Sequence, residues 1–442
     1  MSRCYDGLAR GGFDQDKRSP EFPHDASVQQ SRALSIDARR EAGRGRKSAD
    51  LHEELCDGGM SSHPPAAIVM RPQAGLASVN QNETALGTRM GRKIAIVGAG
   101  AVGGYAGAHM VQAGEDVTFI DPWPEHVEHM RQHGLRVTHA RDVAEFKVAV
   151  RALHVTDVQC LAREKPVEIA FVCMKSYDTA WATMMIRQYL APDGFVVSLQ
   201  NCMNEETIAG VVGWGKTLGC IASSITVNLP APGHIHRGAG KGGAAHTVFR
   251  TGEVHGRITG RAEEIRGLVG TADSAMVTSN LWGERWSKLV ANVMGNGLSA
   301  CTGLPGGEML HNEPIRRFST RLGSEAIRVG QAHGYQLEEI LHLPPETIAR
   351  AGEGDEAAMR ACDEQRFKDG KRIASGQRPS MGQDMQKGRR TEIEFMNGLV
   401  VREGEKIGIA CRANAVLTDL VTRVEKGELK PDPRHITELR LN

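Results

Sequence analysis

The pattern of apolar and polar residues changes at Lys93, where short apolar runs begin to alternate with amphipathic stretches. The runs KIAIV, DVTFI, EIAFVCM and GFVVSL have the length and composition of buried strands. Residues 103–112 and 179–189 have the length of helices that connect such strands, and LGCIASSITVNL and HTVFRTGEV predict further strand in the same domain. Strands that alternate with helices are typical of a parallel sheet covered by helices.

The pattern changes again near residue 281, where the strand signal stops. Apolar residues recur at three- and four-residue spacing through Leu310, over 315–332 and over 392–407, which predicts helices. We therefore expect an α/β Rossmann domain over residues 90–280, an all-α domain over 281–430 and a tail over 431–442. The charged segment 341–377 is long for a plain connection and is interpreted as an insertion over the site.

Residues 1–89 lack sustained periodicity and are rich in Ser, Arg, Gly, Asp and Pro, so we predict a disordered N-terminal extension. The arginines suggest a transit peptide, but the interspersed acids argue against one, because such peptides are poor in acids. An alternative explanation is an upstream-extended reading frame, with Met90 as the working start. A genuine disordered extension and an extended reading frame both remain open.

Composition narrows the classes of partner. A formal net charge of +1 gives no reason to expect nucleic acid or a membrane surface as a partner. The nine cysteines include no CxxC pair and no Cys/His cluster, so we expect neither a disulfide scaffold nor a metal site. The most apolar stretch, residues 94–111, is interrupted by five glycines and a histidine and does not meet the requirement of roughly 20 apolar residues for a membrane span. We expect a cytoplasmic protein that binds small molecules.

A glycine-rich motif follows the first predicted strand. Gly98, Gly100 and Gly103 form GxGxxG between KIAIV and a helix of small residues, and Ala101 and Val102 lie within the motif. The first glycine allows a tight turn, the second lets the backbone approach a pyrophosphate, and the third allows close helix packing. The helix N-terminus supplies amides and partial positive charge. This context predicts a dinucleotide site formed by these five residues.

The next strand ends in Asp121, about 20 residues further on, where an acid can accept hydrogen bonds from ribose hydroxyls. A carboxylate there repels the 2′-phosphate of NADPH, so Asp121 favours NADH. Two alternatives remain open. Asp121 can instead be a helix N-cap before Pro122, and Arg131 or Lys175 can supply a partner for a 2′-phosphate.

A polar face is predicted on the helix that contains WSKLVANVMGNGLSA. Lys288, Asn292 and Asn296 occur at i, i+4 and i+8, within about 80° on one helix face. Asparagine is a poor helix former, so two asparagines in register with a lysine suggest a face presented to substrate. A solvated face is the alternative that the spacing alone leaves open.

A second candidate cluster lies in RPSMGQDMQKGRRTEIEFMNG. Ser380 is placed to cap a helix, with Gln383 completing a capping box, and Glu392 is expected one or two turns into a helix. An ion pair of Glu392 with Arg389 or Lys387 is the structural alternative to a functional role.

The blocks GAGAVGG, MKSYDT, LQNCMNEE, WSKLVANVMGNGLSA, PSMGQD and TEIEFMNG, in this order, resemble the ketopantoate reductase (2-dehydropantoate 2-reductase) family over residues 93–425. The resemblance implies that Lys288 is a general acid and that Glu392 holds a substrate hydroxyl and helps to orient the lysine. It implies substrate contacts from four further residues and a cofactor-edge lysine: Asn201, Asn292, Asn296 and Ser380, with Lys175. A homodimer through the helical domain is implied in the same way.

The reaction implied is reduction of 2-dehydropantoate, or of a related 2-oxo acid, by NAD(P)H without a metal. Asn201 ends the GFVVSL strand, where doubly wound sheets bind ligands, so it is also a candidate cofactor contact. The family typically has a basic residue at the position of Asp121 and uses NADPH, so NADH and NADPH both remain open. Alternatives are an NAD-dependent 2-hydroxy-acid or polyol dehydrogenase, supported by Asp121 and segment 341–377, and a non-catalytic dinucleotide-binding sensor, which Lys288 and Glu392 disfavour.

Overall fold

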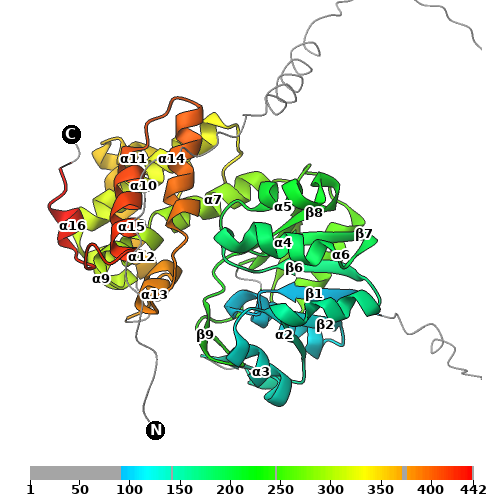
Figure 1. The fold of residues 1–442 in the computed structure, drawn as a ribbon. Coiled ribbons are helices and arrows are strands. Elements are labelled where there is room, and N and C mark those ends of the chain that lie inside the picture. The colour runs from blue at the N-terminus through cyan, green and yellow to red at the C-terminus, as the bar shows by residue number, and fades with distance from the viewer. Residues whose placement is uncertain (1–90, 141–142, 244–245, 371–375, 441–442) are drawn as a thin grey trace, which may run out of the picture. The chain divides into compact units, whose positions relative to one another are not determined.

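The computed structural model describes residues 91–140, 143–243, 246–370 and 376–440. Within these ranges an α/β domain is followed by a helical domain, as predicted (Figure 1). The predicted disordered extension, residues 1–89, lies outside the described residues. None of the helices in the described ranges is long and apolar enough to cross a membrane.

The α/β domain is built on an eight-stranded sheet with the order β12-β11-β8-β7-β6-β1-β2-β5. All neighbouring strands in it are parallel except the antiparallel pair β8 and β11. The strands predicted from the sequence are confirmed. Their bounds are β1 Lys93–Val97, β2 Asp116–Asp121, β5 Arg151–His154, β6 Val167–Val172, β7 Leu190–Ser198, β8 Thr217–Ala222, β11 Phe249–Glu253 and β12 Ala275–Thr278.

Alternation along β1 explains why both faces of this sheet are covered. Ile94 and Ile96 join a core that includes residues of α2 (Ala101–Gln112) and α6 (Gly260–Gly270). Ala95 and Val97 face a second core with residues of α4 (Thr179–Arg187) and α5 (Glu205–Val212). Successive side chains of a strand point to opposite faces, so a continuous apolar run such as KIAIV requires helices on both.

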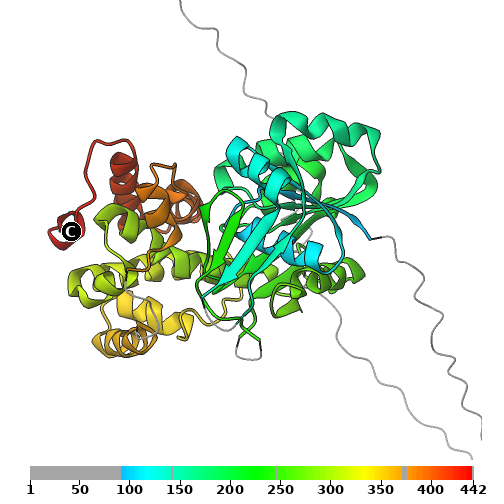
Figure 2. The ribbon, with the colours of Figure 1, turned by 90° about the horizontal axis from the view of Figure 1, so that it is seen from below.

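A second, four-stranded sheet with the order β4-β3-β10-β9 was not expected. Figure 2 shows the α/β domain in a second view. This sheet joins the core on the α2 side through Leu135, Val137 and Ile235. The predicted strand LGCIASSITVNL is therefore divided between the sheets, since its first half is β8 and its second half begins β9. The remaining bounds are β3 Leu135–His139, β4 Phe146–Val148, β9 Val227–Ala231 and β10 His234–Arg237, with α3 Pro124–His133 before β3.

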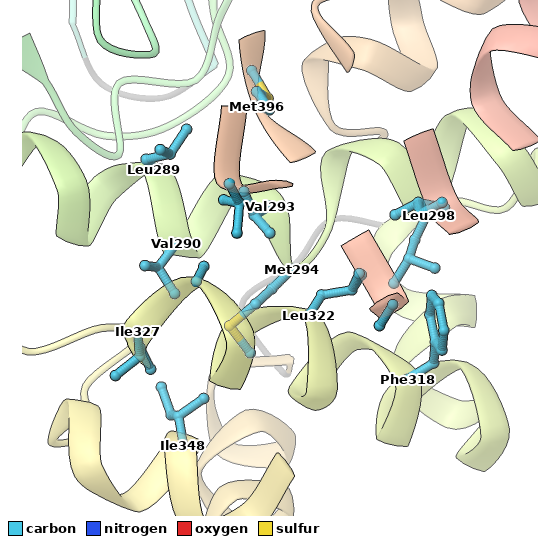
Figure 3. Close-up of a cluster of buried hydrophobic side chains, with 14 of the residues drawn as sticks. Leu289, Val290, Val293, Met294, Leu298, Phe318, Leu322, Ile327, Ile348 and Met396 are labelled. Atoms are coloured by element: carbon cyan, nitrogen blue, oxygen red, sulfur yellow. The ribbon is translucent and has the colours of Figure 1, made fainter. Parts of the chain in front are cut away.

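The second domain is helical, as predicted. Its helices are α7 Leu281–Val293, α8 Asn296–Thr302, α9 Gly306–His311, α10 Glu313–Ala332, α11 Pro345–Gly352, α12 Glu356–Gly370, α13 Ser380–Gln386, α14 Asn397–Lys406, α15 Arg412–Glu425 and α16 Arg434–Thr437. Figure 3 shows part of the core that they share, where Val290 and Val293 of α7 lie near Leu322 and Ile327 of α10 and Ile348 of α11.

The described residues of segment 341–377 contribute to this helical core. They include α11 and α12, which pack against each other, and α11 packs on α10. Ile348, Met359 and Cys362 are buried. The interpretation of an insertion over the site is therefore corrected, because these apolar side chains fill the core. Residues 431–440, expected as a tail, include α16, whose Ile436 is buried in the same core.

Candidate functional site

The glycine-rich motif forms the turn between β1 and α2, and two of its glycines are required sterically. Gly98 has φ +100°, and a Cβ there would lie 2.8 Å from Met174 Sδ. A Cβ at Gly103 would lie 2.1 Å from the carbonyl oxygen of Gly98. Larger residues are excluded at both positions, which supports the roles predicted for them.

Gly100 differs, because nothing lies within 4 Å of the place where its Cβ would be. It is the N-cap of α2, and no side chain caps this helix, which begins at Ala101. The first amides of a helix lack intrahelical partners and attract anions. An open backbone cradle beside an uncapped N-terminus fits a dinucleotide pyrophosphate, so these residues suit the predicted cofactor.

Asp121, at the end of β2, is buried and bonded to the backbone. Its Oδ2 accepts a hydrogen bond from Ala99 N at 2.8 Å and its Oδ1 accepts one from Trp123 N at 2.9 Å. Burial raises the pKa of this carboxyl. The N-cap alternative is wrong, because α3 begins at Pro124 with Trp123 as its N-cap. Each carboxylate oxygen has a second lone pair, so contact with a ribose stays a prediction.

The two basic residues considered for a 2′-phosphate are both paired with acids. Arg131 lies 2.5 Å from Asp157, and Lys175 contacts two carboxylates described below. A further cation lies beside the segment that follows β2, since the guanidinium of Arg389 is 5.8 Å from the centre of the Trp123 ring. The sequence did not indicate that Arg389 lies close to Trp123, because Arg389 follows α13 in the helical domain.

Glu392 joins the helical domain to the end of β6. Its Oε1 accepts hydrogen bonds from the backbone N and the hydroxyl of Ser176, at 3.0 and 2.8 Å, and its Oε2 lies 3.2 Å from Lys175 Nζ. The carboxylate is almost fully buried. No hydrogen bond or ion pair joins it to Lys288 among the described residues, so the predicted orientation of the lysine by Glu392 stays a prediction.

Asp384 is a site residue that the sequence reasoning missed. Its Oδ2 lies 2.5 Å from Lys175 Nζ. Burial lowers the pKa of Lys175, but Glu392 and Asp384 outweigh burial and hold that pKa above its usual range. Burial raises the pKa of Asp384, and Lys175 opposes this shift. Asp384 occurs in the motif PSMGQD, but its contact with Lys175 could be found only in the folded chain.

The backbone around the second cluster differs from the prediction. The helix that begins at Ser380 ends at Gln386, and Gly388 follows in the left-handed conformation, with φ +60°. Glu392 therefore lies outside a helix, immediately before a short 3-10 turn at Ile393–Phe395. Its predicted alternative partners, Arg389 and Lys387, are replaced by Lys175.

Ser380 contacts another predicted residue instead of capping its helix. Its hydroxyl donates to Asn296 Oδ1 at 3.0 Å, and the N-cap of α13 is Pro379. The capping-box prediction is wrong, because the Gln383 amide donates to Arg378 O. Ser380 and Asn296 are thus brought together, as a shared substrate contact requires.

The predicted single helix through Lys288, Asn292 and Asn296 is interrupted. Helix α7 ends at Val293 and α8 begins at Asn296, after Gly295. The carbonyl oxygen of Met294 accepts a hydrogen bond from Ser319 Oγ of α10 at 2.6 Å, and glycine is a weak helix former. Asn296 nonetheless stays close to Asn292, since its Nδ2 donates a hydrogen bond to Asn292 O at 3.2 Å.

The ammonium group of Lys288 differs from that of Lys175, because it has no bonded partner among the described residues. No described residue forms a hydrogen bond or ion pair with its Nζ. Burial, and then the charge of Arg285, lowers the pKa of Lys288 to about 8. The side-chain amides of Asn201 and Asn292 also have no hydrogen bond with described residues, and both are half-buried. These three groups keep their hydrogen-bonding capacity for a ligand.

Cys202 is another residue near the site that the sequence reasoning missed. It follows Asn201, is buried, and has φ +63°, a conformation that side chains other than glycine rarely adopt. The thiol is close enough to both Glu392 and Lys288 for electrostatic interaction. Burial raises its pKa. Lys288 and Glu392 therefore both lie near the Cys202 thiol, although they are not bonded to each other.

Among the residues that the structure describes, no three His, Cys, Asp or Glu side chains gather to hold a metal ion. The arrangement contains an open dinucleotide cradle, a half-buried lysine with a lowered pKa, and amides without hydrogen bonds to described residues. Such groups suit hydride transfer to a carbonyl.

Comparison with known proteins agrees with this chemistry. A family model described as ketopantoate reductase PanE/ApbA matches residues 94–245, and the model of its C-terminal part matches residues 280–425. The 2-dehydropantoate 2-reductase of Archaeoglobus fulgidus is 30% identical over 338 residues, which are 76% of this chain and 99% of that protein. The enzyme of the same name from Halobacterium salinarum is 24% identical over 336 residues, with 76% and 99% covered.

Solved structures show the same fold. The crystal structure of 2-dehydropantoate 2-reductase from Geobacter metallireducens has a TM-score of 0.62 and 27% identity, covering 75% of this chain and 99% of that one. A D-mandelate dehydrogenase solved with NADH and anilino(oxo)acetate has a TM-score of 0.62 at 23% identity, with 76% and 98% covered. The chain belongs to the ketopantoate reductase family of nicotinamide-dependent oxidoreductases.

Proposed function

We propose that this protein reduces 2-dehydropantoate to pantoate, or reduces a closely related 2-oxo acid, with Lys288 as the general acid. The observation that carries the proposal is the half-buried ammonium of Lys288, which has no bonded partner among the described residues and whose pKa is lowered to about 8. A general acid works best when its pKa lies near the working pH. An ordinary exposed lysine would hold its proton too tightly.

Bound NAD(P)H supplies the hydride. Negative charge then grows on the ketone oxygen, where the Lys288 ammonium stabilises it and donates a proton. The proposed position of the ketone is between α7, which carries Lys288, and the carboxyl end of β7, which Asn201 follows. Ligands of doubly wound sheets bind at this edge.

Orientation of the substrate falls to the polar side chains around Lys288. The free amides of Asn201 and Asn292 can bind the carboxylate or a hydroxyl of a 2-oxo acid, and the bonded pair of Ser380 and Asn296 presents a further donor and acceptor. Glu392 is proposed to accept a substrate hydroxyl, since its Oε2 has Lys175 as its hydrogen-bond partner and can accept a second bond.

The direct test is an assay at 340 nm with purified protein, with NADH and NADPH in parallel, against 2-dehydropantoate and a panel of other 2-oxo acids. We expect the highest kcat/KM with 2-dehydropantoate. A clear preference for another panel member would retain the reaction and replace the substrate, whereas no turnover with any 2-oxo acid would refute the proposal.

A second candidate is an NAD-dependent 2-hydroxy-acid dehydrogenase. It is favoured by the buried carboxylate of Asp121 at the end of β2, where it opposes a 2′-phosphate. The structural neighbour that is a D-mandelate dehydrogenase was solved with NADH. Oxidation of 2-hydroxy acids with NAD⁺ at a higher kcat/KM than reduction of any 2-oxo acid would favour this candidate.

We also propose that the enzyme works in the cytoplasm as a homodimer. A ketopantoate reductase from Staphylococcus aureus is described as dimeric. Sedimentation velocity of the full chain tests the dimer, and fractionation of cells that express it tests the compartment.

A further inference from the structure

We propose that Arg285, paired with Glu205, is a positioning residue for Lys288, and that this buried pair fixes α7 against the end of β7 and sets the electrostatic field around the lysine. The inference rests on the proposed role of Lys288 as the acid. It assigns a function to a charged pair that does not itself contact the reacting atoms.

The guanidinium of Arg285 is fully buried and is bonded on several sides. Its Nη1 donates to Gln200 O at 2.6 Å, and its Nη2 donates to Ser198 O at 3.2 Å and forms an ion pair with Glu205. Cys220 O lies 3.4 Å from the same Nη2. One side chain of α7 thereby contacts the end of β7, the backbone of β8 and the start of α5.

These bonds place the two sides of the site. Gln200 immediately precedes Asn201, so the bond to its carbonyl oxygen fixes the backbone from which the Asn201 amide extends. Lys288 follows Arg285 by three residues on α7, and residues at this spacing lie on neighbouring positions of a helix surface. A shift of Arg285 would therefore move Lys288 relative to Asn201.

Anchoring alone does not require charges, because a buried ion pair is often no more stabilising than apolar side chains of the same size. The pair is also not fully satisfied, since Arg285 Nε and Glu205 Oε2 are buried and find no hydrogen-bond partner in the described part of the chain. A buried cation that is costly to keep, one helical turn from an unpaired lysine, points to an electrostatic role.

The charges around Lys288 predict the direction in which each member of the pair shifts the pKa of the lysine. Burial lowers the pKa of Lys288 most, followed by Arg285; the Cys202 and Cys220 thiols raise it and Arg250 lowers it. Arg250 is itself paired with Glu284 at 2.9 Å. Loss of the Arg285 charge should therefore raise the pKa of Lys288. Loss of the Glu205 charge leaves Arg285 uncompensated and should lower it.

The experiment compares Arg285→Met and Glu205→Gln in the full chain. Lysine labelled with ¹³C at Cε reports the Lys288 pKa by NMR titration without substrate or cofactor, and Lys288→Met assigns the signal. We expect shifts in opposite directions, each about half a pH unit or more, with the alkaline limb of the kcat profile moving in parallel. Arg423→Gln, which breaks an exposed pair on α15, should leave the titration unchanged.

Shifts in the same direction, or none, in variants with wild-type circular dichroism would overturn the inference. If a single variant fails to fold, Arg285→Met combined with Glu205→Leu replaces the whole pair with apolar side chains, which buried sites commonly tolerate. In this double variant the Lys288 pKa should still rise, and an unchanged pKa would contradict the role. Failure of the proposed function is distinguishable, because it appears as wild-type turnover in Lys288→Met, whatever the titration shows.

Discussion

Lys175 Nζ lies 2.5 Å from Asp384 Oδ2, although 209 positions separate the two residues in the sequence. Lys175 follows β6 in the α/β domain, and Asp384 belongs to α13 in the helical domain. The same ammonium contacts Glu392, which is also bonded to Ser176. A cation at the carboxyl edge of the sheet thus holds two buried carboxylates of the helical domain at the predicted cofactor edge.

Asp384→Asn should destabilise the protein, because the ion pair with Lys175 becomes a weaker contact with a neutral amide. Removing one partner of a buried charge-assisted hydrogen bond costs about 1–3 kcal/mol. Urea unfolding of the variant and the wild type measures this loss as a lower midpoint. Asp419→Asn, which removes an exposed pair with Arg423, should cost less than about 0.5 kcal/mol. Equal losses in the two variants would show that the Lys175 contact adds no stability.

The pH dependence of turnover follows from the lowered pKa of Lys288. A general acid must carry its proton, so kcat should fall as pH rises through about 8, the pKa of this lysine. Lys288→Ala should lower kcat by about 10²-fold or more and leave the Kd for cofactor nearly unchanged. Lys406→Ala, at an exposed lysine of α14, is the matched control and should behave as wild type. Wild-type turnover in Lys288→Ala would exclude the acid role.

The three motif glycines should respond differently to alanine. Gly100→Ala should fold normally, because the new Cβ meets no protein atom within 4 Å, but that Cβ intrudes where the pyrophosphate is expected and should raise the Kd for NAD(P)H. Gly307→Ala, another position with open space, should change neither folding nor cofactor affinity. Isothermal titration calorimetry measures the affinities.

Gly103→Ala should instead destabilise the protein, because its Cβ would lie 2.1 Å from Gly98 O. We expect a lower thermal unfolding midpoint for this variant. Unchanged cofactor affinity in a folded Gly100→Ala variant would place the pyrophosphate elsewhere.

The sequence predicted those parts of the site that depend on local steric rules. The glycine motif, the strands and the helical second domain follow from spacing and side-chain size over a few neighbouring residues. The break between α7 and α8 depends instead on Ser319 of α10, and the position of Glu392 depends on the left-handed turn at Gly388. Local patterns do not report such contacts.

The ion pairs of the site were beyond sequence reasoning for the same reason. Asp384 and Ser176 both occur in motifs that the resemblance singled out, but only the folded chain pairs them with Lys175 and Glu392. Cys202 also occurs in one of these motifs, LQNCMNEE, but its conformation was not predictable, because a single residue with positive φ has no sequence signature unless it is glycine or asparagine.

Cofactor preference should depend on Asp121, because its carboxylate opposes a 2′-phosphate at the end of β2. Asp121→Asn removes the charge and keeps an acceptor oxygen for one of the two backbone N–H groups that Asp121 binds, those of Ala99 and Trp123, while the other N–H loses its acceptor. Two like charges a few ångströms apart near a protein surface repel by on the order of 1–4 kcal/mol, so affinity for NADPH relative to NADH should rise about tenfold. Quenching of tryptophan fluorescence, with Trp123 close to the site, measures both Kd values. Asp116→Asn, at the exposed start of the same strand, should leave their ratio unchanged. Equal changes for the two cofactors in Asp121→Asn would limit Asp121 to holding the backbone turn.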